Sequence, residues 1–150
     1  MHKKTSLIAA ALVWLAVLFG PAVSQAQMPH PAVKGFETEW VYRVRYGFIE
    51  EWWDLFRKYE VPIFEKLKER GYILEYRIYH PRAHTDEASR WDYRVEIRWK
   101  DQDAQFQAAV VGQELFKDTA TRKREDRRRW ELTTNHWDLP IYQVDPSTGR

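Results

Sequence analysis

The hydrophobic pattern changes its period several times along the chain, and each change predicts a new element of secondary structure. Over residues 38–46 polar and apolar positions alternate, as in a half-buried strand, with one parity formed by Trp40, Tyr42, Val44 and Tyr46. The period then lengthens to that of a helix, whose apolar stripe comprises Ile49, Trp52, Trp53, Phe56, Tyr59, Ile63 and Leu67. Gly71 suits the position just past the helix end, and Pro62 predicts a kink within the helix.

Two later stretches return to a period of two and predict a hairpin. In residues 72–80 one parity consists of Tyr72, Leu74, Tyr76, Ile78 and His80. In residues 90–100 the apolar parity consists of Trp91, Tyr93, Val95, Ile97 and Trp99. The polar stretch PRAHTDEAS between them predicts a long loop, so the two strands should pair, with their apolar parities under the helices.

The remainder of the chain predicts a second helix and a short final strand. Asp101 or Asp103 can cap the helix, which should bury the apolar side chains Phe106, Ala109, Val110, Leu115 and Phe116. Gly112 weakens the middle of this helix. The apolar piece Leu139–Val144, with Pro140 at its start, is typical of an edge strand.

The order strand, helix, strand, strand, helix and short strand predicts a single α+β domain over residues 38–144. One crossover helix followed by a hairpin indicates a ferredoxin-like split βαβ antiparallel sheet with two helices on one face. Residues 27–37 lack periodicity and are expected to form a flexible leader, and residues 145–150 a frayed tail.

The stretch from Tyr42 to Tyr79, YRVRYGFIEEWWDLFRKYEVPIFEKLKERGYILEYRIY, resembles the first half of the NIPSNAP-like proteins of the dimeric α+β barrel superfamily. The shared features are an opening strand, an amphipathic helix with a late proline, a Gly-aromatic exit and a second strand. The resemblance covers roughly residues 38–117. It implies a homodimer in which two sheets face each other. It leaves the chemistry open, because the superfamily includes cofactor-free oxygenases, haem-handling proteins, isomerases and members without known activity.

Residues 1–26 have the pattern of a secretory signal peptide. Basic residues precede an apolar run over residues 7–19, and the small-residue sequence Ser24-Gln25-Ala26 follows it. The apolar run is shorter than the roughly 20 residues of a spanning helix, which favours a cleaved signal peptide over a membrane anchor. Cleavage after Ala26 would leave a mature chain without a transmembrane segment. We therefore expect export to the periplasm or the medium.

Export changes what the composition says about partners. Removing residues 1–26 takes away two lysines and no acid, which leaves 22 basic against 22 acidic residues. The mature chain would therefore be close to neutral, and its charge gives no argument for nucleic-acid binding. The chain has no cysteine, which excludes disulfides, thiol nucleophiles and thiolate metal sites.

The polar parities of the three predicted long strands together form one charged sheet face. Its cations are Arg43, Arg45, Arg77, Arg90, Arg94, Arg98 and Lys100, and its anions are Glu39, Glu75, Asp92 and Glu96. The simpler interpretation is a solvated ladder of cross-strand pairs. The alternative is a polar cavity, roofed by a second subunit, in which surplus guanidinium groups bind a small anionic ligand. Its predicted ligand-binding residues are Arg43, Arg45, Arg77, Arg94 and Arg98.

The hairpin loop offers a second kind of chemistry. His80, His84 and Asp86 could form part of a metal site, although an ordinary polar loop needs no metal, and we expect none. His80 also lies at a strand end, where a general base or a haem ligand could sit. His80 is the sole catalytic candidate, and haem the only alternative to having no cofactor.

The basic run Arg122 to Arg129, RKREDRRR, is compatible with a polar helix whose cations suit the negative end of the helix dipole. Three functions therefore stay open. The first is an exported homodimer that binds a small anionic or aromatic ligand in a polar sheet-face cavity. The second is a cofactor-independent or haem-dependent monooxygenase-like enzyme. The third is a protein that binds a partner or a membrane surface through the basic helix. Whether the chain is an enzyme is left undecided.

Overall fold

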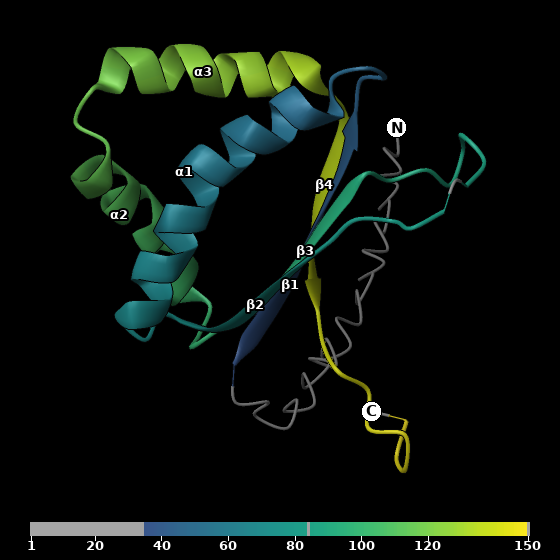
Figure 1. The fold of residues 1–150 in the computed structure, drawn as a ribbon. Coiled ribbons are helices and arrows are strands. Elements are labelled where there is room, and N and C mark those ends of the chain that lie inside the picture. The colour runs from purple at the N-terminus through teal and green to yellow at the C-terminus, as the bar shows by residue number, and fades with distance from the viewer. Residues whose placement is uncertain (1–34, 84, 150) are drawn as a thin grey trace, which may run out of the picture.

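The computed structural model, which describes residues 35–83 and 85–149, is an α+β fold with a four-stranded antiparallel sheet (Figure 1). The elements in chain order are β1 (Phe36–Val44), α1 (Ile49–Glu69), β2 (Ile73–Tyr79), β3 (Tyr93–Trp99), η1 (Asp103–Phe106), α2 (Gln107–Leu115), α3 (Thr119–Leu132) and β4 (Thr133–Ile141). The strand order is β2-β3-β1-β4, with every neighbouring pair antiparallel. The predicted ferredoxin-like split βαβ sheet is confirmed.

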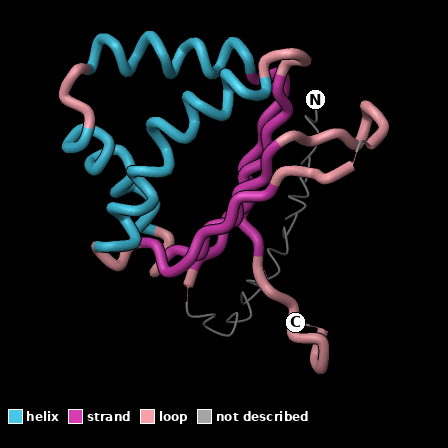
Figure 2. The backbone as a smooth tube through the Cα atoms, viewed as in Figure 1, coloured by secondary structure: helices cyan, strands magenta, loops and turns pink. Residues whose placement is uncertain are grey.

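The three α-helices of the described residues lie on one side of the sheet, and Figure 2 shows the helical and strand layers separated. The side with the helices is called the inner face below, and the opposite side the outer face. The predicted signal peptide lies outside the described residues. Strand β1 begins at Phe36, two residues before the predicted start, because Phe36 and Glu37 already pair with Trp99 and Arg98 of β3.

Helix α1 follows its predicted stripe closely. Its buried residues include Trp52, Phe56, Ile63 and Leu67, each at most 2% exposed. The helix runs without interruption through Pro62, and Gly71 just beyond it has a φ of +74°, a conformation that favours glycine.

The inner face of β3 provides the other half of the core. Its predicted residues Tyr93, Val95, Ile97 and Trp99 are all buried. Trp52 of α1 stacks on Tyr93 with ring centroids 4.8 Å apart. The indole of Trp99 donates a hydrogen bond to the hydroxyl of Thr38 (2.9 Å), so its one polar atom is satisfied.

Strand β2 departs from its predicted parity at its start. Ile73 is 1% exposed, whereas Leu74, predicted to be in the core, is 45% exposed. The cause is a β-bulge: Ile73 pairs with Trp99 and Glu75 with Arg98, which leaves Leu74 without a partner in β3. Beyond the bulge Tyr76 and Ile78 pack against the core as predicted.

The prediction for the second helix was wrong about most of its buried side chains. Phe106, Val110 and Leu115 are 65%, 47% and 41% exposed, and Ala109 is exposed as well. The core instead receives Ala104 and Val111, with Phe116 partly buried. Residues 103–106 form a 3₁₀ turn rather than the first turn of the α-helix, and this shifts the face that meets α1.

The fourth strand exists but begins six residues earlier than predicted. Helix α3 ends at Leu132 and β4 follows it directly from Thr133, pairing with β1 at the edge of the sheet. Pro140 lies inside β4, as an edge strand allows. The polar residues Thr133 and Asn135 concealed the start of this strand from the hydrophobic pattern.

Candidate functional site

The outer face is the part of the sheet that no described helix covers (Figure 1). Cross-strand pairing brings Glu37, Glu39, Glu75 and Glu96 to this face together with Arg43, Arg77, Arg94 and Arg98. The opposite charges are equal in number, so the predicted surplus of arginine is absent. Arg45 and Lys100 lie beyond the strand ends, and the sequence pattern had missed Glu37 because it was assigned to the leader.

Arg90 and Asp92, which the parity pattern put on the charged face, are instead a buried ion pair. They are 8% and 5% exposed. The Arg90 guanidinium donates Nε to Oδ1 (3.2 Å) and Nη2 to Oδ2 (2.8 Å) of Asp92. Asp92 also accepts from the backbone N–H of Val44 at 2.7 Å, and Arg90 donates to the Val44 carbonyl. This pair therefore closes the end of β1.

Arg94 lies between two carboxylates and two aromatic rings. Its Nε is 3.4 Å from Glu39 and its Nη2 is 3.3 Å from Glu96. Its guanidinium lies 4.8 Å from the ring centre of Tyr79 and 5.3 Å from that of Trp91. The sequence pattern assigned Trp91 to the inner face, but Trp91 precedes β3 and its ring lies against Arg94. Arg94 therefore bridges Glu39 and Glu96 on the outer face. It lines neither of the two hollows described next.

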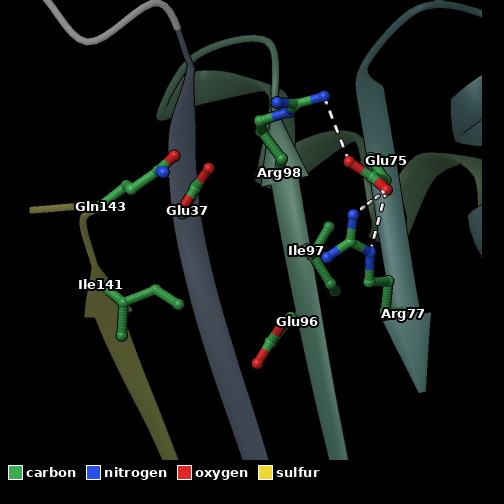
Figure 3. Close-up of a pocket in the computed structure, with 8 residues that line it drawn as sticks. All are labelled: Glu37, Glu75, Arg77, Glu96, Ile97, Arg98, Ile141 and Gln143. Carbon is green, nitrogen blue, oxygen red and sulfur yellow. Dashed lines mark hydrogen bonds and ion pairs between the residues drawn. The ribbon is translucent and has the colours of Figure 1, made fainter. Parts of the chain in front are cut away.

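The first hollow lies at the end of the outer face where β1 begins, and has a volume of about 280 Å³ (Figure 3). Its lining residues are Glu37, Glu75, Arg77, Glu96, Ile97, Arg98, Ile141 and Gln143. Glu75 holds both arginines: Arg77 Nη2 lies 2.7 Å from Oε1, and Arg98 Nη2 lies 3.2 Å from Oε2. Three carboxylates and two guanidinium groups thus line the hollow.

The second hollow, of about 350 Å³, lies at the opposite end of β1. Its lining residues are Arg43, Val44, Arg45, Tyr46, Glu87, Arg90, Thr134 and Asn135. The hydroxyl of Tyr46 donates to Glu87 at 2.7 Å, and this bond holds the pKa of the Glu87 carboxyl below its ordinary value. Of the five predicted ligand-binding arginines, the fold brings Arg43 and Arg45 together here, separate from Arg77 and Arg98.

An apolar stripe adjoins the first hollow along the edge of the sheet. Trp137, Leu139 and Ile141 of β4 pair with Val41, Glu39 and Glu37 and so share the outer face with them. Leu139 is 46% exposed, whereas Val41 beside the stripe is only 3% exposed. The sequence could not predict this stripe, because the parity of β4 depends on its register with β1.

The candidate metal ligands of the hairpin loop are described only in part. His84 lies outside the described residues, and Asp86 caps the N–H of Ser89. No cluster of three potential metal-ligating side chains forms within residues 35–83 and 85–149. His80 Nδ1 lies 2.8 Å from the carbonyl oxygen of Asp92, so this nitrogen is the donor and Nε2 is left out of that hydrogen bond. That geometry is compatible with a base, but His80 lines neither hollow.

The predicted basic helix α3 directs part of its charge inward, towards α1. Arg129 is 4% exposed and donates to Glu60 (3.0 Å) and Asp126 (2.9 Å). Burial raises the pKa of the Glu60 carboxyl, although Arg129 opposes this effect. Arg128 forms two hydrogen bonds with Glu51 at 2.7 and 3.0 Å. Within the described part of the chain, no helix has the length and apolarity needed to cross a membrane.

Comparisons with known proteins support the fold but do not assign the chain to a family. No family model matches the chain, and no curated protein matches it. A dimeric ferredoxin-like protein from an uncultured marine organism is similar in structure, with a TM-score of 0.53 and 6% identity over 73% of this chain and 90% of that chain. A Pseudomonas aeruginosa protein has a TM-score of 0.51 and 15% identity over 75% of this chain and 96% of that chain.

A candidate antibiotic biosynthesis monooxygenase from Nitrosomonas europaea has a TM-score of 0.47 and 10% identity over 75% of this chain and 93% of that chain. Likenesses at such identities show the fold alone. The finer resemblance to NIPSNAP-like proteins and the monooxygenase alternative therefore stay predictions.

Proposed function

We propose that the chain forms a homodimer through its outer sheet faces and binds a small carboxylate-bearing ligand in the first hollow. The observation that carries the proposal is a hollow of about 280 Å³ on the uncovered face, lined by Arg77 and Arg98. Both guanidinium groups keep exposed N–H donors, since their side chains are 60% and 46% exposed. A guanidinium binds a carboxylate through two parallel hydrogen bonds.

The lining also narrows the class of ligand. Glu37, Glu75 and Glu96 outnumber the two arginines, so a ligand with only negative charge would leave carboxylates facing one another. Glu37 has no cationic partner within 4 Å in the described part of the chain. A ligand that has an amine or hydroxyl group beside its carboxylate matches both kinds of side chain.

A second subunit would complete this site. The apolar stripe of Trp137, Leu139 and Ile141 borders the hollow, and its burial would favour association of two outer faces. Structural neighbours of this fold are described as dimeric. The charged residues between the stripes would remain wet or paired, because a dry interface would make their desolvation costly. With the predicted signal peptide, the dimer would act outside the cytoplasm.

The test combines light scattering with a thermal-shift screen of the purified protein. The protein should be a dimer at tens of micromolar, and amino or hydroxy carboxylic acids should raise Tm more than the same acids without those groups. Arg98→Gln should reduce the shift. Arg127→Gln, which removes an exposed guanidinium on α3, is the matched control and should leave the shift unchanged. A monomer, or equal shifts in both variants, would contradict the proposal.

A further inference from the structure

The second hollow contains a carboxylate already, and that carboxylate belongs to the chain itself. Glu87, in the loop between β2 and β3, places its two oxygens against donors from different segments. Arg43 Nη1 lies 3.8 Å from Oε1, while Arg90 Nη1 (3.5 Å) and the Tyr46 hydroxyl (2.7 Å) approach Oε2. These three donors are called the Glu87 cradle.

The Glu87 cradle is held in place by contacts that do not involve Glu87. Arg43 donates Nε to the carbonyl of Arg90 (3.0 Å) and Nη2 to that of Ala88 (3.2 Å). Arg90 is fixed by its buried pair with Asp92 and by the Val44 carbonyl. The ring of Tyr46 lies 3.7 Å from the Arg90 guanidinium carbon. The donors are therefore preorganised for a carboxylate, which lowers the cost of binding one.

Glu87 itself is held much less firmly. Its side chain is 59% exposed, and both of its contacts with arginine are long. Exposed ion pairs of this kind add little stability. The Glu87 side chain can therefore turn into solvent and leave the cradle to another carboxylate.

The charge of the second hollow favours such a replacement. Arg43, Arg45 and Arg90 line it against Glu87 alone, and Asp92 behind Arg90 adds a second acid. Three cations and two anions leave one positive charge while Glu87 is in place. When Glu87 turns away, two positive charges remain for an incoming ligand.

We propose that the second hollow is a binding site for small carboxylates, in which the side chain of Glu87 occupies the site in the absence of a ligand and competes with it. The ligand carboxylate would take over the donors from Arg43, Arg90 and Tyr46. A second acidic group on the same ligand would meet Arg45, whose guanidinium is exposed and donates only to the Glu131 carbonyl among the described residues (3.3 Å). The class that fits best is a short dicarboxylate.

The experiment measures succinate binding by calorimetry at constant ionic strength, with neutral succinamide as the matched compound. Glu87→Gln keeps the shape of the side chain and removes its charge. It should bind succinate about tenfold more tightly than the wild type if Glu87 fills the cradle nine-tenths of the time. Succinamide should bind neither protein.

Two further variants in the Glu87→Gln background locate the site. Tyr46→Phe removes one cradle donor but keeps the ring on Arg90, and should lower succinate affinity severalfold. Arg127→Gln removes an exposed guanidinium on α3, outside both hollows, and should leave the affinity unchanged. Glu87 and Tyr46 line the second hollow and not the first, which separates this site from the proposed function. Equal affinities of wild type and Glu87→Gln, or a loss of affinity in Arg127→Gln as large as that in Tyr46→Phe, would overturn the proposal.

Discussion

The two faces of the sheet come from the same strands, yet their side chains differ in burial and in charge. On the inner face, Tyr93, Val95, Ile97 and Trp99 pack against α1 and are almost wholly buried. On the outer face, arginines and glutamates form ion pairs across and along the strands and stay partly exposed. Packing on the inner face therefore stabilises the fold, while no described helix covers the charged side chains of the outer face. The comparison teaches that alternation assigns faces well within a strand and poorly at its ends.

The largest expected effect comes from Asp92, which has the outer parity but is buried. Asp92→Ala would leave the Arg90 charge and the Val44 N–H without their partner, and should lower the free energy of unfolding by about 3–5 kcal/mol. Urea denaturation measures this change. Asp54→Ala, which removes an exposed carboxylate from α1, is the control and should cost little. Comparable losses in both variants would show that Asp92 behaves as an outer-face residue.

A smaller effect should separate two neighbours at the β2 bulge. Ile73→Ala should lower the free energy of unfolding by about 2–5 kcal/mol, because it empties a site in the core. Leu74→Ala should change it by about 0.5 kcal/mol or less, since Leu74 is exposed. The same denaturation measurement compares the two variants directly. The reverse order would mean that the strand keeps an unbroken alternation without a bulge.

The smallest effect is expected at Arg94. Arg94→Ala removes two ion pairs and two ring contacts, but the side chain is 35% exposed, so the loss of stability should be about 1 kcal/mol or less. Ligand affinity should change less than in Arg98→Gln, because Arg94 lines neither hollow. Thermal melting with and without ligand measures both quantities. A selective loss of affinity would return Arg94 to the binding residues.

The sequence predicted which arginines lie on the outer face, but it did not predict which of them share a hollow. Arg77 and Arg98 were assigned to the outer face by parity and do line a hollow there. Arg43 and Arg45 were assigned with them but belong to a different hollow at the other end of β1. Glu87 had no signal, because a loop carboxylate follows no periodicity. Tyr46 was assigned to the apolar parity of the first strand, but it lies beyond the end of β1 and is 67% exposed.

The apolar face of α2 shows the same limit in the helical layer. Phe106 and Val110 have the spacing of a buried stripe but are exposed, since a 3₁₀ turn precedes the helix and rotates it. The replacement of the first α-helical turn by a 3₁₀ turn leaves no mark on the spacing of the apolar residues, yet it decides which side chains meet α1.

The sequence by itself determined the α+β class, the ferredoxin-like order of the long elements and the inner face of β3. These depend on local period and on short connections, which any window of the chain contains. Only the tertiary structure decided the bulge at Leu74, the burial of Arg90 and Asp92, the equal balance of charge outside and the division into two hollows. Each of these depends on the register between strands and on which loop closes over a strand end, and such contacts join residues far apart in the chain.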